Sequence, residues 1–285
     1  MKIIRTLYDM TEYRVQQRDR GASVGFVPTM GALHEGHMSL VKKAVEENMV
    51  TVVSVFVNPI QFNNKEDFAK YPRTEEEDFK LLASAGVDAV FAPTAEEIYP
   101  EENCDNKEYA LGSVAEVMEG KYRPGHFQGV ARVLDILFRL VDPHRAYFGE
   151  KDFQQIAVVR NLVKSEGLKV EIVACPIKRA NDGLALSSRN SRLSEEQRKA
   201  APEIYETLKY SVEYSKDHSV RATHDTVVEH LDAIPGMRVE YFQIVDARTL
   251  QPVEEWEMSD WIVGCITVYV GDVRLIDNIT YRTPH

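Results

Sequence analysis

The sequence has few cysteines, no excess of positive charge and no long apolar run. Its 285 residues include only three cysteines, Cys104, Cys175 and Cys265, which are widely spaced and form no Cys-x-x-Cys pair. This spacing argues against a disulfide framework and a zinc knuckle, so each cysteine is expected to be a free thiol that is at least partly buried. No apolar run approaches the ~20 residues that are needed to span a bilayer.

The overall charge is acidic, since 45 Asp and Glu residues outnumber 34 Lys and Arg residues and give a net charge of −11. Nucleic-acid binding normally needs a basic surface and is not expected, whereas a small anionic ligand depends on local charge alone. Residues Met1 to Arg20 are charged and lack the apolar segment of a secretory signal. We therefore expect a cytoplasmic protein with no membrane segment.

Short apolar runs alternate with amphipathic stretches through the first two-thirds of the chain. The predicted strands are Val24–Val27, Thr51–Val57, Asp88–Phe91, Ala146–Phe148 and Val170–Cys175, and the predicted helices are Arg73–Ala85, a helix through Val130–Val141, and Phe153–Glu166. Strands and helices that alternate at this spacing predict an α/β fold with a doubly wound parallel sheet.

The pattern changes after Pro176. Helices are expected at Glu195–Asp217 and Ala222–Ala233, followed by strand segments at Val239–Val245 and Trp261–Ile279 with a tight hairpin around Gly271. Helices followed by antiparallel strands predict a separate, smaller α+β domain. We expect domains at residues 1–176 and 177–285, with no long linker between them.

The most informative segment is PTMGALHEGH at residues 28 to 37, directly after the first predicted strand. The strand is expected to end in a small-residue turn that opens a helix with His34 and His37 on one face. A helix N-terminus attracts phosphate, and two imidazoles one turn apart can reach the same anion. Zinc proteases use His-Glu-x-x-His, and here the second histidine comes one place early. The alternative is one capping or packed histidine and one solvated histidine.

Polar side chains also follow two other predicted strands. Gln61 comes after Asn58-Pro59 and could donate to a carboxylate and accept from a hydroxyl, although the segment could simply terminate a strand. In FGEKDFQQ, Lys151 could neutralise a polyphosphate, while Asp152 could cap the helix or hold Mg²⁺ through water. Gln155 lies one turn further on. The alternative is a capped helix with solvated charges.

Two further polar segments fall outside the strand ends. The segment DGLALSSRN at residues 182 to 190 supplies two hydroxyls and an arginine for phosphate oxygens, in a loop that could close over a ligand. An ordinary polar turn before the next helix is the alternative. The segment RPGHFQGV places His126 in a turn before the strongest predicted helix, where it could line a site or serve only the turn.

Together these segments resemble the pantoate–β-alanine ligase family of the HIGH-motif nucleotidyltransferase superfamily. The resemblance rests on six segments between residues 28 and 190, namely PTMGALHEGH, FVNPIQF, YPRT, RPGHFQGV, FGEKDFQQ and DGLALSSRN. It implies a Rossmann-like ATP- and pantoate-binding domain with a smaller lid domain, in a cytoplasmic homodimer that uses Mg²⁺. The implied reaction joins pantoate to β-alanine through a pantoyl adenylate, and yields pantothenate, AMP and pyrophosphate.

The resemblance also implies roles for individual residues. His37, His34 and Lys151 would be catalytic, Gln61 and Gln155 would bind pantoate, and Gln61 would also bind β-alanine. The implied ATP-binding residues are Met30, Gly31, Ala32, Leu33, His34, Glu35, Gly36, His37, Gly149, Glu150, Lys151, Asp152, Lys178, Leu186, Ser187, Ser188 and Arg189.

Two positions depart from the family pattern. Leu186 stands where a methionine is usual, a swap that conserves volume. Lys178 stands where the family usually has an apolar residue whose main chain contacts adenine. The rival interpretations are a nucleotidyltransferase that forms no amide, a non-catalytic nucleotide sensor, and a zinc hydrolase that uses both histidines.

Overall fold

The computed structural model describes residues 1–63, 65–100 and 107–284, so Cys104 lies outside the described residues. A six-stranded sheet has the order β1-β4-β3-β2-β5-β6, and its neighbouring strands are parallel. The strands are β1 (Lys2–Ile4), β2 (Val24–Thr29), β3 (Val50–Val55), β4 (Ala89–Phe91), β5 (Arg145–Gly149) and β6 (Glu171–Cys175). The doubly wound parallel sheet is therefore confirmed; the short edge strand β1 was not predicted.

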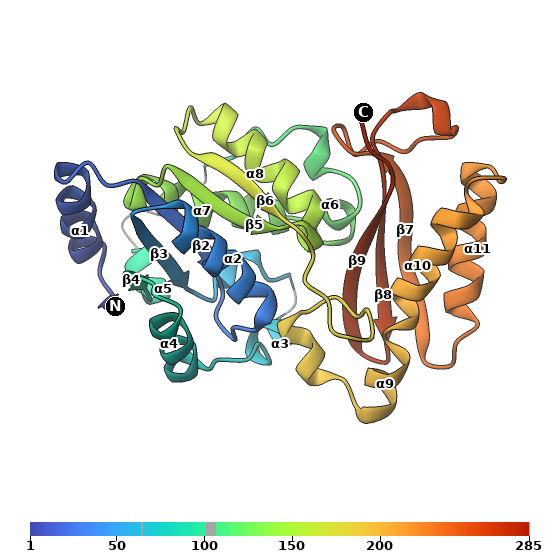
Figure 1. The fold of residues 1–285 in the computed structure, drawn as a ribbon, viewed down its shortest axis with the longest axis horizontal. Helices are drawn as coiled ribbons and strands as arrows, with labels where there is room; N and C mark the ends of the chain where they lie inside the picture. The colour runs from blue at the N-terminus through green and yellow to red at the C-terminus, as the bar shows by residue number, and fades with distance from the viewer. Residues whose placement is uncertain (64, 101–106, 285) are drawn as a thin grey trace.

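Helices cover both faces of this sheet (Figure 1). They are α1 (Leu7–Asp19), α2 (Glu35–Glu47), α3 (Lys65–Ala69), α4 (Glu75–Ser84), α5 (Ala95–Ile98), α6 (Glu119–Tyr122), α7 (His126–Val141) and α8 (Phe153–Ser165). Successive strand residues point to opposite faces. Phe26 of β2 accordingly packs in the core that contains α1, α7 and α8, while its neighbour Val27 packs in the core that contains α2 and α4.

The order of the strands places a topological switch point between β2 and β5. From β2 the chain continues to β3 and β4 on one side, and after β5 it continues to β6 on the other side. β2 and β5 are parallel neighbours, with Phe26 opposite Ala146, so their carboxyl ends meet. Open α/β sheets bind ligands in the crevice at such a point. The segments that follow these two strands are the ones that contain His34, His37 and Lys151.

The remainder of the chain forms an antiparallel sheet with three helices. The strands are β7 (Met237–Asp246), β8 (Ile262–Val270) and β9 (Val273–Arg282), and the helices are α9 (Glu195–Ala200), α10 (Glu203–Tyr214) and α11 (Val220–Asp232). The predicted hairpin is present, with Gly271 at φ +58°. The single helix expected at Glu195–Asp217 is wrong, because Pro202 lacks an amide proton and separates α9 from α10.

The antiparallel sheet lies beside the parallel one, and α10 and α11 cover its outer face (Figure 1). Tyr241 and Cys265 face the first part of the chain and join its core. Their neighbours Phe242 and Ile266 pack in the second core, with side chains of α10 and α11. One face of β7–β9 thus packs toward the parallel sheet, and the other face packs against α10 and α11. No helix among the described residues is long and apolar enough to cross a membrane.

Candidate active site

The turn after β2 is held by a buried carboxylate. Gly31 has φ +77° and Ala32 has φ +49°, which folds the chain sharply before α2. Asp78 of α4 is 1% exposed, and it accepts hydrogen bonds from the backbone N–H groups of Ala32, at 2.9 Å, and Leu33, at 2.8 Å. Sequence reasoning missed Asp78, because it lies 46 residues from Ala32 and no local pattern links the two.

His34 and His37 form a pair at the start of α2. His34 is the N-cap of the helix rather than part of it, which corrects the expectation that both histidines lie on one helix face. Its Nδ1 accepts from the Gly36 N–H at 3.1 Å, and the Nδ1 of His37 accepts from the His34 N–H at 3.4 Å. The ring centroids are 4.1 Å apart. Since each Nδ1 is an acceptor, a neutral ring carries its proton on Nε2.

Both imidazoles are neutral at pH 7. Burial lowers the pKa of His34 to about 4, and the nearby charge of Lys151 lowers it further. Burial likewise lowers the pKa of His37 to about 3, with smaller effects of His34 and Lys151. The histidines therefore offer Nε2–H donors rather than positive charge. Among the described residues no group of three or more His, Cys, Asp and Glu could hold a metal ion, so the structure gives the zinc hydrolase no support.

A small cavity of about 180 Å³ lies at the carboxyl ends of β2, β3 and β5. One part of its lining is apolar and comes largely from α7, through Val130, Val133, Leu134 and Leu137. The polar lining includes His37, Asn58, Gln61, Asp152 and Gln155, and the thioether of Met30 lies beside Gln61. This combination suits a small ligand that has both alkyl and hydrogen-bonding groups.

A buried amide fixes the side chain of Gln61. Asn58 is 1% exposed and donates to Gln61 Oε1 at 3.0 Å and to the Gly129 carbonyl at 3.1 Å. It also accepts from the Tyr99 hydroxyl at 2.9 Å. Gln61 Nε2 lies 3.0 Å from Met30 Sδ. The side-chain oxygen of Gln61 therefore already accepts one hydrogen bond. From the sequence, Asn58 was expected only to end a strand.

The second strand-end turn follows β5. Gly149 leads into a short 3₁₀ turn, Glu150–Asp152, before α8 begins. Asn278 of β9 donates to the carbonyls of Glu150, at 2.8 Å, and Lys151, at 3.1 Å, so the second sheet holds this turn. Asp152 occupies the N-cap position of α8, but its side chain makes no capping hydrogen bond, which corrects that expectation. The carboxylate lies 3.9 Å from Lys151 Nζ.

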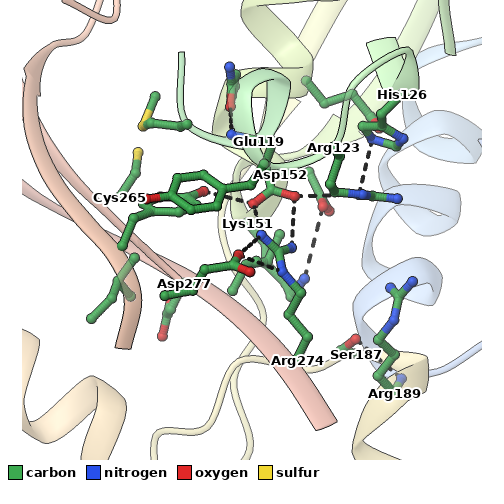
Figure 2. A pocket seen from close by; sticks show the side chains of 18 of the residues that line it. Glu119, Arg123, His126, Lys151, Asp152, Ser187, Arg189, Cys265, Arg274 and Asp277 are labelled. Carbon is green, nitrogen blue, oxygen red and sulfur yellow. Dashed lines mark hydrogen bonds and ion pairs between the residues drawn. The ribbon is translucent and has the colours of Figure 1, made fainter. Parts of the chain in front are cut away.

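A larger cavity of about 600 Å³ separates the two sheets (Figure 2). It shares Asp152 and Gln155 with the small cavity, so the two spaces meet there. Six cationic side chains line it, namely Lys70, Arg123, Lys151, Arg189, Arg192 and Arg274. Seven carboxylates line it as well, namely Glu66, Asp67, Glu119, Asp152, Glu240, Asp272 and Asp277. The cavity is therefore mixed in charge, and binding of an anionic ligand depends on individual cations within it.

Glu119 joins the second sheet to this cavity. Arg274 of β9 donates to its two carboxylate oxygens at 2.7 and 2.8 Å, and the Tyr241 hydroxyl donates at 2.8 Å. Burial alone would raise the pKa of Glu119, but the contacts with Arg274 outweigh burial and lower the pKa to about 2. Sequence reasoning did not identify Glu119 or Arg274, which are 155 residues apart.

The segment after β6 is docked on the first part of the chain. Arg189 and Arg192 each donate to Asp67 of α3 at 2.8 Å, and the Ser188 hydroxyl lies 3.1 Å from that of Tyr71. Ser187 and Arg189 line the large cavity. Leu186 lies against the start of α2, since a Cβ on Gly36 would be 3.6 Å from its own.

The remaining expected residues lie less centrally. Lys178 lines neither cavity, and its carbonyl accepts from the Leu186 N–H at 3.0 Å. His126 is buried and lines the large cavity; its Nε2 lies 3.2 Å from Arg123 and its Nδ1 2.9 Å from the Gln61 carbonyl. Arginine can only donate, so the Nδ1 of His126 carries the proton.

Comparisons of the sequence and of the fold match the chain, over nearly its whole length, to a single enzyme family. A family model described as pantoate–β-alanine ligase matches residues 2–280. Pantothenate synthetase of Bacteroides thetaiotaomicron is 54% identical over 282 residues, which cover 99% of each chain. The crystal structure of pantothenate synthetase from Thermus thermophilus has a TM-score of 0.92 at 44% identity, covering 99% of this chain and 100% of that one.

A third similar protein was solved with ligands. The structure of pantoate–β-alanine ligase from Francisella tularensis, complexed with β-γ ATP and β-alanine, has a TM-score of 0.82 at 36% identity. It covers 99% of this chain and 98% of the Francisella chain. With the family model, the sequence identity and the fold in agreement, the chain belongs to the pantoate–β-alanine ligase family, within the HIGH-motif nucleotidyltransferase superfamily.

Proposed function

We infer that this chain catalyses the ATP-dependent ligation of pantoate and β-alanine to pantothenate, with AMP and pyrophosphate as the other products. The observation that carries this conclusion is the pair of cavities at the switch point. A small cavity with apolar and amide lining meets, at Asp152 and Gln155, a larger cavity whose lining includes Lys151 and Arg189. A hydroxy acid fits the first and a polyphosphate fits the second, so an acyl adenylate can form where they meet.

The binding roles follow from this placement. Pantoate occupies the small cavity, with its alkyl part on α7 and its polar groups on Gln61 and Gln155. The phosphates of ATP lie between the start of α2 and the turn Gly149–Asp152, beside the rings of His34 and His37 and the charge of Lys151. The loop through Ser187, Ser188 and Arg189 covers the β- and γ-phosphates, and residues 30–37 and Lys178 bind the remainder of ATP.

In the first step the pantoate carboxylate attacks the α-phosphorus of ATP in line. A P–O bond forms to pantoate, and the bond to pyrophosphate breaks. Charge accumulates on phosphate oxygens, so positioned donors stabilise the transition state. His34 and His37 supply Nε2–H donors, Lys151 supplies a positive charge, and Arg189 stabilises the leaving pyrophosphate.

In the second step the neutral amine of β-alanine attacks the acyl carbon of pantoyl adenylate. The C–N bond forms, the C–O bond to AMP breaks, and one amine proton passes to solvent. The mixed anhydride is also open to attack by water, so the site must stay closed while the amine enters. The docking of Arg189 and Arg192 on Asp67 supports a role of the loop as a lid.

Magnesium fits this site as a companion of ATP rather than as a resident ion. Mg²⁺ usually takes one or two carboxylates together with substrate phosphates and water, and Asp152 lies beside Lys151 at the junction of the cavities. Asp152 would hold the ion, which would neutralise charge on the phosphates. The protein residues perform the remaining steps described above.

Three further assignments belong to the same proposal. Residues 1–176 form the domain that binds ATP and pantoate, and residues 177–285 form the lid domain; the end of β6 at Cys175 supports this boundary. The protein is a homodimer, as the resemblance implies. It acts in the cytoplasm, where the thiols Cys175 and Cys265, which are free in the structure, would stay reduced.

A two-stage assay tests the function. With ATP and Mg²⁺, pyrophosphate release should require pantoate and should not require β-alanine. Addition of β-alanine should then yield pantothenate, detected by mass, in a 1:1 ratio with AMP. Release of pyrophosphate that does not depend on pantoate would contradict the assignment, and so would formation of an adenylate that β-alanine never converts to an amide.

A further inference from the structure

Arg123 is the guanidinium of the large cavity whose charge is least satisfied by carboxylates. Its Nη1 lies 3.4 Å from Glu119 Oε2 and 3.2 Å from His126 Nε2 (Figure 2). Its other two nitrogens have no hydrogen bond to any residue that the structure describes. The nearby Glu119 is already bound through both oxygens by Arg274.

The other arginines of this cavity are better paired. Arg189 and Arg192 each bind Asp67 at 2.8 Å, and Arg274 has both Glu119 and Glu240. Burial lowers the pKa of Arg123, and although Glu119 opposes this, the charges of Arg189 and Arg274 lower it further. An anion that bound at Arg123 would therefore relieve repulsion among cations as well as satisfy free N–H donors.

Arg123 is linked through His126 to Gln61, which lines the small cavity. His126 accepts from Arg123 and donates to the Gln61 carbonyl, at 3.2 and 2.9 Å. The guanidinium is thus held one imidazole away from the segment that carries Gln61. Since the two cavities meet at Gln155, a ligand bound to Arg123 can extend toward an acyl group held in the small cavity.

We propose that Arg123 binds the carboxylate of the amine substrate, β-alanine, and so sets the specificity of the second step. This proposal rests on the proposed function. The amine of β-alanine must reach the acyl carbon while its carboxylate points away from that carbon. A planar guanidinium with two free nitrogens matches a carboxylate bidentately, whereas Lys151 and Arg189 serve the phosphates.

The test separates the two steps in the full-length protein. In Arg123→Gln, pantoate-dependent pyrophosphate release without β-alanine should stay within about threefold of the wild type. The KM for β-alanine should rise about 10- to 100-fold, the range for losing a charge-assisted hydrogen-bond pair. The matched control is Arg221→Gln, since Arg221 is an arginine of α11 that lines neither cavity and has a side chain that is 92% exposed. Its KM should change less than twofold.

A substrate without the carboxylate distinguishes binding from a general structural effect. The wild type should prefer β-alanine to β-alaninamide, measured as the ratio of the two kcat/KM values. Arg123→Gln should reduce this ratio at least tenfold. Arg123→Lys keeps the positive charge but cannot bind a carboxylate through two parallel N–H groups, so it should reduce the ratio less. The lysine variant also provides the test if the glutamine variant does not fold.

Two results would overturn the proposal. One is an unchanged ratio in Arg123→Gln and Arg123→Lys. The other is a loss of pyrophosphate release that equals the loss of amide formation, which would place Arg123 in the first step. By contrast, a wild-type protein that releases no pyrophosphate with pantoate would contradict the proposed function itself, and the two failures are therefore distinct.

Discussion

At the scale of single residues, the site combines neutral imidazole donors with a few fixed charges. His34 and His37 each use Nδ1 to accept a backbone proton, which leaves Nε2–H as the donor. Lys151 is the cation whose charge lowers the pKa of both rings. We therefore expect the phosphates to be stabilised in two ways, by hydrogen bonds from the imidazoles and by the charge of the lysine.

This division of labour predicts the effect of truncating either partner. His37→Ala or Lys151→Ala should lower the rate of adenylate formation by about 10²–10³, the scale for losing a positioned donor in a water-poor site. Single-turnover measurements of pyrophosphate release with saturating ATP and pantoate give this rate. His230→Ala, at an exposed position of α11, should leave it unchanged. Near-normal rates in both site variants would refute the assignment of these residues.

The buried histidines also predict how stability depends on pH. The pKa of His126, lowered mainly by burial and then by Arg123, is about 3, like that of His37, and that of His34 is about 4, against 6.5 ordinarily. As the pH falls below about 6.5, only the unfolded chain takes up these protons, so the free energy of unfolding decreases. The loss continues until the folded-state pKa values are reached.

A single substitution measures the contribution of one histidine. In His126→Gln, the decrease in unfolding free energy between pH 6 and pH 4.5 should be shallower by about 1 kcal/mol per pH unit. Urea titrations at several pH values give the slope. His230→Gln serves as the exposed control. An equal slope in His126→Gln and the wild type would show that His126 is protonated in the folded state.

At the scale of elements, the turn after β2 depends on a helix that is distant in sequence. Asp78 of α4 accepts from the N–H groups of Ala32 and Leu33, one with each oxygen. In Asp78→Asn one of those oxygens becomes an NH₂ group, and a donor then faces a donor. The turn that leads to His34 must shift, or a buried N–H group loses its partner at about 1–3 kcal/mol.

The prediction for Asp78→Asn concerns ATP more than pantoate. The KM for ATP should rise at least tenfold, while the KM for pantoate changes by less than threefold, because most of the lining of the small cavity comes from other segments, among them α7 and residues 58–61. Steady-state kinetics of pyrophosphate release distinguish the two. Glu77→Gln, at the exposed neighbouring position, is the control. Equal increases of both KM values would mean that Asp78 supports the whole fold rather than this turn.

Sequence reasoning found the elements but not the contacts between them. Apolar runs and strand-end motifs located five of the six parallel strands and the turns with His34 and Lys151, because these signals are local. The partners that fix the turns are distant in sequence, such as Asp78 for Ala32 and Asn278 for Lys151. Pro202 is itself a local signal for the break between α9 and α10, because a proline within a helical pattern ends or kinks the helix.

At the scale of the whole molecule, the large cavity lies between the two sheets. Arg189 and Arg192, in the loop after β6, both form ion pairs with Asp67 of α3. We call these two ion pairs the latch. Asp67 thus holds this loop against the first part of the chain, and all three side chains line the large cavity. We expect this latch to protect the adenylate from water.

Release of the latch should uncouple the reaction. In Asp67→Asn both arginines lose an anionic partner, so the loop should open more often and pantoyl adenylate should be hydrolysed. AMP release with ATP and pantoate but no β-alanine should increase severalfold over the wild type. The control is Asp260→Asn, which removes an exposed carboxylate paired with Arg248. Unchanged AMP release in Asp67→Asn would show that this contact does not exclude water.

The central claim is that the carboxylate of pantoate attacks the α-phosphorus where the two cavities meet. Pantoate labelled with ¹⁸O in its carboxylate tests it most directly, because an acyl adenylate leaves one carboxylate oxygen on AMP when β-alanine displaces it. We expect one ¹⁸O atom in the phosphate of each AMP, measured by mass spectrometry. Unlabelled AMP with the label in another product would contradict the claim.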